Sequence, residues 1–383
     1  MAQHTNSSVE ATELLRELPG GWTCTRTIAR GAFADVYEGT DSAGGPVAIK
    51  IPHSKHPQTV PRFLREARVM QAMPSNPHVV TYRGMGEVDG LPFLVMEFVD
   101  GAPLQDILDR GEAIEPNAAI EVILQLCDAL GGMHKLGISH GDIKPGNVLV
   151  RADRTIKLID FGLVRDSGHV FRAMEEEQLL SGSAFSEELD AGMLMGTPEY
   201  LSPEAISDSF ATQRSEVRRD TPADVFAIGV LMYQMFTGRR LWPFEPDAGS
   251  RAEYIEQAKN YLDARLKIEA DDIPRPPEID NALWSILKRT LQRSPADRQL
   301  DALSLYRDLE RYNLRGVGVF SPFLNPARIL MDGSATGVGS GLIRVVQREV
   351  PPQVQRGPEP LPLALFGVIA VVAALALWVF VSY

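Results

Sequence analysis

The sequence has little of the features that mark disulfide-rich proteins and nucleic-acid-binding proteins. Its 383 residues include only two cysteines, Cys24 and Cys127, too few for a disulfide framework or a CxxC metal pair. The formal net charge at pH 7 is -12, whereas a nucleic-acid binder usually presents a basic face. We therefore exclude a disulfide-stapled secreted fold and expect no nucleic-acid partner.

The N-terminus lacks the apolar run of a signal peptide. Residues 1–20 are polar and include acidic side chains, and no apolar stretch among them reaches the required length. The scarcity of cysteine also suits a reducing compartment. We expect the bulk of the chain in the cytoplasm.

The C-terminus, by contrast, contains one long uncharged run. No charged residue occurs in 361–383, and about 20 apolar residues suffice for a helix to cross a bilayer. Arg344, Arg348 and Arg356 precede the run and favour a cytoplasmic position for the preceding segment. The run predicts one transmembrane helix and single-pass attachment to the cell membrane. The alternative is a buried core helix, for which the sequence offers no further core-forming segment downstream.

Residues 22–312 change from strand-like to helix-like patterns along their length. Short β-like runs such as PVAIKI and PFLVMEFV come first, and apolar residues recur at helical spacing after Pro116. Residues 313–360 are punctuated by Gly and Pro without a sustained period, which indicates a linker. We expect a polar segment (1–21), an α+β domain of two lobes (22–312), the linker and the membrane helix (361–383). Clefts between two such lobes are favoured ligand sites.

Two short segments carry the residue types that phosphoryl transfer needs. They are HGDIKPGN, residues 140–147, and LIDFG, which contains Asp160. The reaction needs a carboxylate near the attacking hydroxyl, oxygen ligands for Mg²⁺ and a cation against the phosphate charge. Asp142 can accept the hydroxyl proton and Lys144 can face the transferred phosphate. Asn147 and Asp160 can hold the metal ions.

Weaker signals lie upstream of these segments. Gly31 falls between two β-like runs, where a missing Cβ lets the backbone approach phosphate oxygens. Ala48 and Lys50 lie on one face of a strand, as an adenine and its phosphates would require. Glu66 lies in an apolar helical stripe and can pair with Lys50. Each has an ordinary alternative: a turn glycine, an edge lysine, a surface glutamate.

In this order the motifs resemble those of the eukaryotic-like Ser/Thr protein kinases found in bacteria, over residues 22–312. The resemblance implies a bilobal protein-kinase-like fold with a small β-rich N-lobe and a larger helical C-lobe. It implies ATP and Mg²⁺ as cofactors, protein Ser/Thr hydroxyls as substrates, and membrane-associated signalling with the kinase domain in the cytoplasm. Homodimerisation stays open.

The resemblance also assigns a nucleotide pocket. Lys50 would be held by Glu66. Ile28 and Val36 would lie on either side of the adenine, under the Gly-rich loop that contains Gly31, and Ala48 would lie beside the adenine. Met96 would form the back of the pocket and Leu149 its floor. Glu97 and Val99 would give the backbone contacts of the hinge.

Downstream, GTPEYLSPE at 196–204 resembles the substrate-positioning segment of the family. Thr197 would then bridge Asp142 and Lys144. Together with Lys144 two places after the base, this form is similar to Ser/Thr rather than tyrosine kinases.

Two further motifs are expected to stabilise the C-lobe. DVFAIGV at 224–230 resembles the buried helix that anchors the catalytic loop, and Arg298 of SPADR would pair with Glu204. Losing one side of such a buried pair typically costs about 3 to 5 kcal/mol.

The sequence departs from the family pattern in three places. The glycine motif appears as Ala29, Gly31 and Ala34, which predicts a looser approach to the phosphates. Gly141 replaces the Arg that normally pairs with an activation-loop phosphate, and 175–180 belongs to an acidic insertion.

Two other functions compete with an active protein kinase. A pseudokinase scaffold is suggested by the two alanines of the glycine motif, but all the charged and metal-binding positions are intact. A small-molecule phosphotransferase is suggested by HGD with Asn five residues after the Asp, but such enzymes lack GTPEYLSPE and SPADR.

Overall fold

The structure, a computed structural model, describes residues 13–31, 33–53, 59–111, 113–166, 197–210 and 221–314. The predicted membrane helix at 361–383 and nearly all of the predicted linker lie outside these residues, as does the acidic insertion. Within the described ranges, no helix is both long and apolar enough to cross a membrane. The membrane helix therefore stays a prediction.

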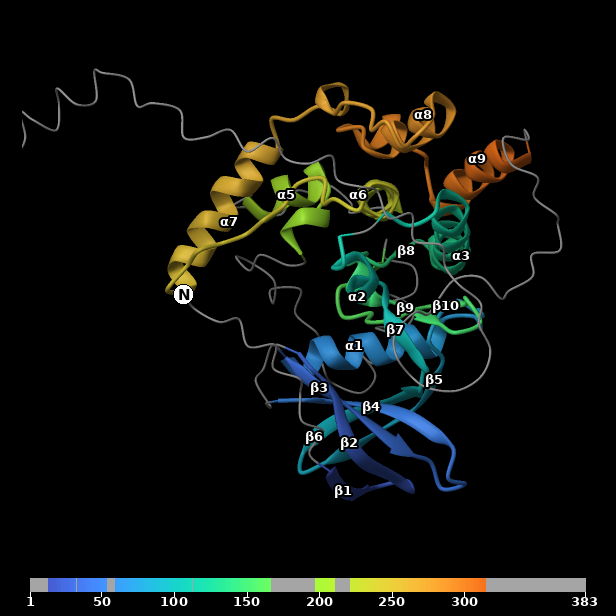
Figure 1. Cartoon of the computed structure of the whole chain (residues 1–383). Coiled ribbons are helices and arrows are strands. Elements are labelled where there is room, and N and C mark those ends of the chain that lie inside the picture. The colour runs from blue at the N-terminus through green and yellow to red at the C-terminus, as the bar shows by residue number, and fades with distance from the viewer. Residues whose placement is uncertain are drawn as a thin grey trace, which may run out of the picture. The chain divides into compact units, whose positions relative to one another are not determined.

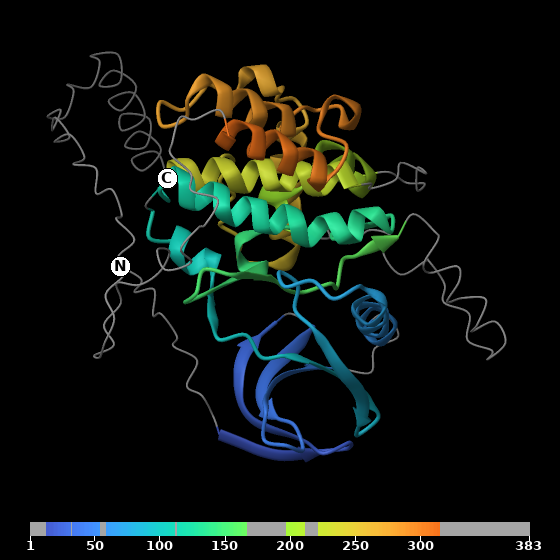
Figure 2. The same cartoon turned by 90° about the vertical axis from the view of Figure 1, so that its right-hand side faces the viewer.

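The N-lobe is built on one antiparallel sheet of six strands in the order β1-β2-β3-β4-β6-β5, and Figure 2 shows how it curls. The strands are β1 (Glu13–Leu18), β2 (Trp22–Arg30), β3 (Ala34–Thr40), β4 (Pro46–Pro52), β5 (Tyr82–Val88) and β6 (Leu91–Glu97). Alternation along β4 places Val47 and Ile49 in a small core with Phe93. Ala48 and Lys50 face the other way, toward the larger core and the site.

Strand β1 was not foreseen from the sequence, which gave only a polar segment there. It pairs with β2 at the edge of the sheet, and its Leu18 is buried beside Cys24. The structured domain therefore begins before residue 22. A strand of six residues with two adjacent leucines shows no regular alternation of apolar and polar residues for sequence reasoning to detect.

Helix α1 (Thr59–Ala72) packs on the sheet on the side that faces the C-lobe (Figure 1). Phe63, Ala67 and Met70 recur at spacings of four and three residues and are buried, as expected for an amphipathic helix. Glu66 is buried among them. A buried carboxylate needs a charged or hydrogen-bonding partner, and α1 thereby delivers an acid to the site.

The C-lobe is mainly helical. Its helices are α2 (Leu104–Leu108), α3 (Pro116–Lys135), α5 (Pro203–Phe210), α6 (Thr221–Thr237), α7 (Arg251–Arg265), α8 (Asn281–Thr290) and α9 (Ala302–Leu314). Short 3₁₀ turns are η1 (Pro145–Asn147), η3 (Pro198–Tyr200), η4 (Ala270–Asp272) and η5 (Pro295–Asp297). Nearly all of α6 is buried, since it is apolar on every side and packs against α3, α8 and α9.

Short strands flank the segments that hold Asp142, Asn147 and Asp160. They are β7 (Gly101–Pro103), β8 (Ile138–Ser139), β9 (Val148–Arg151), β10 (Ile156–Leu158) and β11 (Arg165–Asp166), in the orders β10-β9-β7 and β11-β8. The larger core is continuous from Ala48, Leu94 and Met96 of the N-lobe into α3 and α6. The bilobal fold predicted from the sequence is confirmed.

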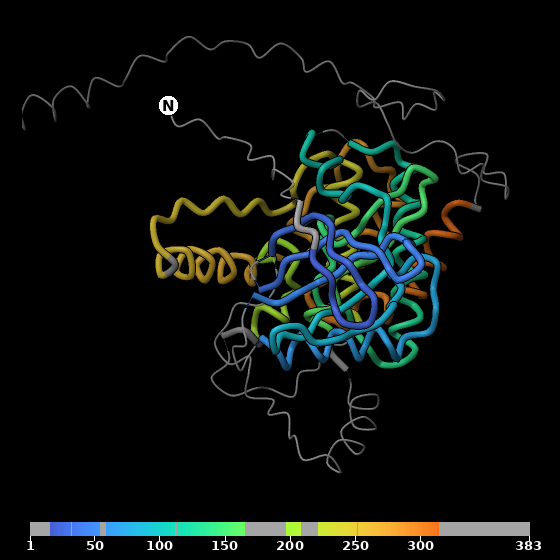
Figure 3. The backbone as a smooth tube through the Cα atoms, turned by 90° about the horizontal axis from the view of Figure 1, so that it is seen from below, coloured from blue at the N-terminus to red at the C-terminus, as the bar shows by residue number. Residues whose placement is uncertain are grey.

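Helix α7 extends outward from the rest of the C-lobe, as Figure 3 shows. Along it only Ala258, Leu262 and Arg265 are buried among the residues whose side chains are described. Leu262 packs with Leu201 and Ile206, so this narrow stripe fixes α7 against the segment that follows residue 196.

Candidate active site

A lysine on β4 makes hydrogen bonds with two carboxylates, one on α1 and one just after β10. Lys50 Nζ, on β4, donates to both carboxylate oxygens of Glu66 on α1, at 2.7 and 2.8 Å. It also donates to Asp160 Oδ1, just after β10, at 3.0 Å. The Glu66 side chain is 4% exposed and that of Asp160 is 44% exposed, so the cluster opens to solvent at Asp160. The pair predicted between Lys50 and Glu66 is confirmed.

The charges of this cluster follow from competing effects on the pKa values. Burial lowers the pKa of Lys50, but Glu66 and Asp160 outweigh it and hold that pKa above its usual value. Burial raises the pKa of Asp160, but Lys50 outweighs it and lowers that pKa to about 2. Both groups are therefore charged at neutral pH, as a phosphate-binding cation and a metal-binding carboxylate must be.

The catalytic loop brings a second cation to a third carboxylate. Lys144 Nζ donates to Asp142 Oδ2 at 2.8 Å. The Asn147 amide nitrogen donates to the same oxygen at 3.0 Å and to the Asp142 carbonyl at 2.8 Å. Among the described residues no hydrogen bond joins the Thr197 hydroxyl to Asp142 or Lys144, so its bridging role stays a prediction.

Helix α6 holds the catalytic loop through one buried carboxylate. Asp224 accepts hydrogen bonds from the backbone N–H groups of His140 at 2.7 Å and Gly141 at 2.9 Å, and its Oδ2 lies 3.0 Å from His134 Nε2. Burial raises the pKa of Asp224, but the bond to His134 and these further contacts outweigh it and lower that pKa. The anchoring role predicted for residues 224–230 is confirmed.

Gly141 has a backbone reason to be glycine. Its φ is +78°, and a Cβ there would lie 2.7 Å from the Leu163 carbonyl oxygen. An L side chain at this position would therefore be strained and would also collide with its neighbour. The sequence showed only that an arginine was missing.

The segment around Asp160 is held in an uncommon conformation. Asp160 has a φ of +64°, which a non-glycine residue adopts only when its surroundings hold it. Gly162 N–H donates to Asp160 Oδ1 at 3.3 Å. Phe161 is buried and meets the His140 ring edge-on at 5.2 Å. These contacts join the segment predicted to bind metal to the catalytic loop.

The predicted nucleotide-pocket residues lie on neighbouring strands. Val36 is opposite Lys50 across β3 and β4, and Ala48 is opposite Met96 across β4 and β6. The remaining members are Ile28 on β2, Gly31 between β2 and β3, Glu97 and Val99 at the end of β6 and just beyond it, and Leu149 on β9.

The two alanines of the glycine motif lie within the sheet. Ala29 pairs with Val36 and Ala34 begins β3, so both occupy strand positions that accept a Cβ. Gly31 instead forms the turn: its N–H donates to the Ala34 carbonyl at 3.0 Å, and a Cβ would lie 2.8 Å from that oxygen. Only one of the three positions therefore requires glycine here.

Glu97 is held by contacts that the sequence did not reveal. Its N–H donates to the Thr81 carbonyl at 2.8 Å, and its Oε2 accepts from Lys157 Nζ at 2.9 Å. Burial raises the pKa of Glu97, but the hydrogen bonds from Lys157 and Thr81 outweigh it and lower that pKa. Because the N–H is already used, a backbone contact from Glu97 to a nucleotide would come from its carbonyl.

The 3₁₀ turn η3 is fixed from the C-lobe. Tyr200 Oη donates to Gln234 on α6 at 2.5 Å, and Glu199 accepts from Arg240 Nη1 at 3.2 Å. None of these partners was foreseen, since they carry no motif and come from distant parts of the chain.

Arg265, at the end of α7, is another buried partner that was not foreseen. It donates to the carbonyls of Pro198 and, at 2.9 Å, Leu201, and its guanidinium lies 4.3 Å from the Trp242 ring centroid. Burial lowers its pKa to about 10, although Tyr261 and Glu199 act against this. The residue stays charged at neutral pH and ties α7 to the segment after residue 196.

The pair predicted between Glu204 and Arg298 is confirmed. Both guanidinium nitrogens Nη1 and Nη2 donate to the carboxylate at 2.7 Å, and Arg298 is 2% exposed. Its other donors reach the carbonyls of Pro222 and Gln292, and it lies 4.9 Å from the Phe226 ring centroid. The pair therefore joins α5, α6 and η5.

The protein kinase domain family matches residues 22–303 of the chain. The chain belongs to the protein kinase family. It is 32% identical over 295 residues to serine/threonine-protein kinase PknL of Mycobacterium tuberculosis (strain ATCC 25618 / H37Rv), across 74% of this chain and 63% of PknL. It is 32% identical over 287 residues to Pkn1 of Myxococcus xanthus, across 73% of this chain and 36% of Pkn1.

A third relative is the probable serine/threonine-protein kinase PknB of Lactococcus lactis subsp. lactis, 30% identical over 289 residues, across 74% of this chain and 40% of that protein. The kinase chain thus spans less than two thirds of the length of these three relatives. Membership supports an ATP-dependent protein Ser/Thr kinase of the bacterial, eukaryotic-like type.

Protein kinases use ATP as phosphoryl donor and Mg²⁺ as cofactor, and the residues of this site fit both. Mg²⁺ prefers hard oxygen ligands. Asp160 is ionised and partly exposed, while the Asn147 nitrogen is the donor to Asp142, which makes the amide oxygen the atom that can bind metal. Lys50 is charged, as a phosphate-binding cation must be.

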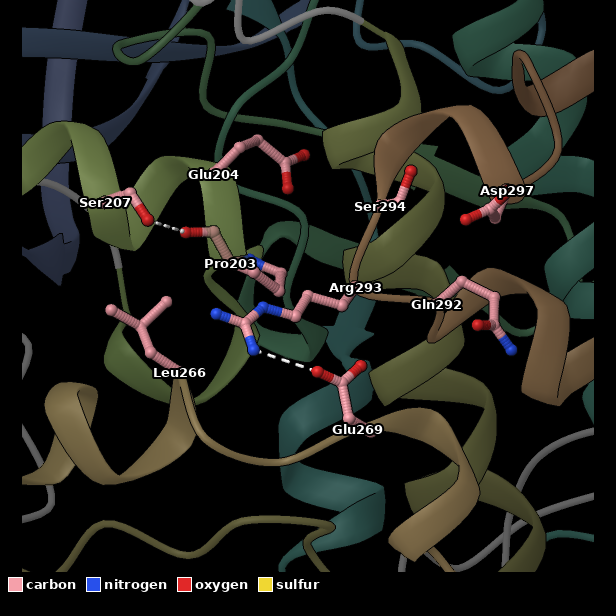
Figure 4. A pocket seen from close by; sticks show the side chains of 9 residues that line it. All are labelled: Pro203, Glu204, Ser207, Leu266, Glu269, Gln292, Arg293, Ser294 and Asp297. Carbon is pink, nitrogen blue, oxygen red and sulfur yellow. Dashed lines mark hydrogen bonds and ion pairs between the residues drawn. The ribbon is translucent and has the colours of Figure 1, made fainter.

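A pocket elsewhere in the kinase domain lies beside α5, η4 and η5 (Figure 4) and has a volume of about 450 Å³. It is lined by Pro203, Glu204, Ser207, Leu266, Glu269, Gln292, Arg293, Ser294 and Asp297. Of these described residues, none belongs to the predicted nucleotide or metal sites. The pocket is therefore separate from the site of phosphoryl transfer.

Proposed function

We propose that the chain transfers the γ-phosphoryl group of ATP to Ser or Thr hydroxyls of proteins. The observation that carries this proposal is the presence of two clusters of charged side chains. Lys50, Glu66 and Asp160 form one, and Asp142 with Lys144 forms the other. Family membership supports the same reaction.

In the proposed reaction, Asp142 accepts the proton of the substrate hydroxyl. The hydroxyl oxygen forms the new bond to the γ-phosphorus while the bond to the oxygen bridging to the β-phosphorus breaks, and ADP leaves. Lys144, 2.8 Å from the base, stabilises charge on the transferred group. Lys50 orients the phosphates of the nucleotide. Mg²⁺ bound by Asn147 and Asp160 would neutralise phosphate charge.

The class of acceptor can be tested directly. The full chain is incubated with labelled ATP and Mg²⁺, with generic protein substrates in one series and aminoglycosides or choline in another. We expect label on Ser and Thr of protein and none on the small molecules. Label on aminoglycosides or choline would support a small-molecule phosphotransferase instead.

A scaffold without transfer is the second candidate, because Ala29 and Ala34 replace glycines of the loop. Both alanines occupy strand positions, which favours an active enzyme over a scaffold. Chelation of Mg²⁺ distinguishes the two: it should abolish transfer in a kinase, whereas a scaffold transfers no label with or without the metal.

We also propose that residues 361–383 anchor the kinase in the membrane with its catalytic domain in the cytoplasm, and that it acts there in signalling. The uncharged run and the preceding arginines support this. A chain ending at Pro360 should be soluble and active, whereas the full chain should stay with membranes at high salt. Release of the full chain by salt would contradict the proposal.

A further inference from the structure

One side chain of α1 contacts two segments that both approach the proposed phosphate site. Arg62 Nε donates to the Gly162 carbonyl at 2.9 Å, directly after Asp160 and Phe161. The Arg62 guanidinium carbon also lies 5.0 Å from the ring centroid of Phe33, at the tip of the Gly-rich loop. Arg62 thus touches the loop above the phosphates and the segment that would hold the metal.

The tip of the loop is also fixed from the opposite side. The Phe33 carbonyl accepts a hydrogen bond from the His53 N–H at 2.9 Å, and the His53 ring nitrogen Nε2 lies 2.9 Å from Asp35 Oδ1. The backbone of the tip is therefore tied to the end of β4. The Phe33 ring remains 45% exposed, and Arg62 contacts its face.

The segment around Asp160, like the tip of the loop, is held by contacts from other parts of the chain. The left-handed φ of Asp160 persists only where neighbours hold it. Lys50 and the Gly162 N–H hold the carboxylate, and Arg62 holds the Gly162 carbonyl. A Cβ on Gly162 would lie 3.5 Å from Arg62 Nη2, so the guanidinium packs directly on this glycine.

Arg62 and Glu66 are four residues apart on α1 and therefore project from the same face of the helix. Glu66 fixes Lys50, and Arg62 fixes the loop tip and Gly162. One face of α1 thus contacts the proposed phosphate-binding cation, the loop above the phosphates and the proposed metal-binding segment, and holds the three in fixed positions relative to one another.

We infer that Arg62 is a positioning residue of the phosphoryl-transfer site, which couples the tip of the Gly-rich loop to the Asp160 segment. The inference rests on the proposed function. It requires the planar guanidinium, because Nε donates the hydrogen bond while the charged plane lies over the Phe33 ring. A lysine ammonium cannot make both contacts with the same geometry.

The first experiment measures Mg²⁺-ATP affinity by calorimetry, and kcat and KM for ATP, in the full chain. We expect Arg62→Gln to weaken ATP binding and lower kcat/KM by about tenfold each, from the loss of a charge-assisted hydrogen bond and a cation–π contact. Arg62→Lys should give a smaller loss of about threefold on the same grounds. The matched control is Arg68→Gln, the same charge change on α1, which should stay within about twofold.

A double-mutant cycle tests the coupling itself. Phe33→Leu keeps an apolar tip but removes the aromatic face. If Arg62 acts through Phe33, the double variant should bind ATP less than about twofold more weakly than Arg62→Gln alone. Equal thermal midpoints for the variants and the wild type exclude a general loss of folding. If Arg62→Gln does not fold, Arg62→Lys and Phe33→Leu complete the same cycle.

The outcomes separate the inference from the proposed function. A wild-type chain that binds and transfers phosphate, with Arg62→Gln indistinguishable from Arg68→Gln, overturns the inference alone. Fully multiplicative effects in the cycle also overturn it, because they show that Arg62 and Phe33 act independently. A wild-type chain that neither binds ATP nor transfers phosphate overturns the proposed function, and the inference with it.

Discussion

The two lobes hold their parts of the site in different ways. On the C-lobe, Asp224 and Arg298 are 1% and 2% exposed, and each bonds to two or more backbone groups as well as to a side-chain partner, His134 for Asp224 and Glu204 for Arg298. On the N-lobe, the Phe33 ring is 45% exposed. Buried charged networks are costly to break, whereas exposed contacts are individually weak. We infer that the C-lobe provides a rigid frame for the reacting groups and that the exposed tip of the Gly-rich loop, unlike the buried Lys50–Glu66 pair of the same lobe, provides an adjustable grip on the nucleotide.

The largest effect should come from Glu204→Ala, which leaves the buried Arg298 without its charged partner. We expect the free energy of unfolding to fall by about 3 to 5 kcal/mol, measured by denaturant titration. Glu269→Ala is the matched control, because Glu269 and Arg293 form an exposed ion pair beside the same pocket (Figure 4). That control should cost less than about 1 kcal/mol. Equal losses of unfolding free energy in the two variants would show that the buried pair stabilises the C-lobe no more than the exposed pair does.

Asp224→Asn should rank next. The amide can accept only through one oxygen, whereas the carboxylate accepts from His140 and Gly141 with separate oxygens. We expect a loss of about 2 kcal/mol in the free energy of unfolding, together with a large fall in kcat. A variant with reduced stability but unchanged kcat would show that the catalytic loop does not depend on this anchor.

Gly141→Ala tests the backbone of the catalytic loop. A methyl group at φ +78° and 2.7 Å from the Leu163 carbonyl should destabilise the fold by about 1 to 3 kcal/mol. Gly132→Ala is the control: it lies in α3 with no atom within 4 Å of the added Cβ, and should stabilise by up to about 1 kcal/mol. Thermal unfolding of both variants checks the difference in sign.

The smallest effect should come from Ser181, Ser183 and Ser186, which lie outside the described residues. Gly141 offers no cation to an activation-loop phosphate, and Asp224 anchors the catalytic loop without any phosphate. We therefore expect the triple alanine variant to change kcat by less than about threefold. A phosphatase-treated enzyme that loses most of its activity, and regains it with phosphate on one of these serines, would contradict this.

The sequence was most informative where a motif names both partners of a contact. The Lys50–Glu66 and Glu204–Arg298 pairs followed from motifs whose partner positions the family pattern specifies. Arg62 and Arg265 gave no such signal, because each sits in a charged stretch of a helix and reveals its role only when distant segments fold against it.

Two other interpretations of the sequence concern the glycine motif and Thr197, and neither is decided by a contact in the structure. The alanines of the glycine motif predict a looser approach to the phosphates, and this stays a prediction; their places in β2 and β3 depend on strand register, which the motif alone does not specify. The bridging role of Thr197 is a statement about hydroxyl geometry, and it stays a prediction.

The central claim is that this chain is an active protein kinase in which Asp142 is the base. The most direct measurement compares Asp142→Asn with the wild type for Mg²⁺-ATP affinity and for label transfer to protein Ser and Thr. The substitution removes the proton acceptor and leaves the N-lobe grip on ATP intact. We predict loss of transfer with ATP affinity within about twofold of the wild type. Unchanged transfer in Asp142→Asn would contradict the account.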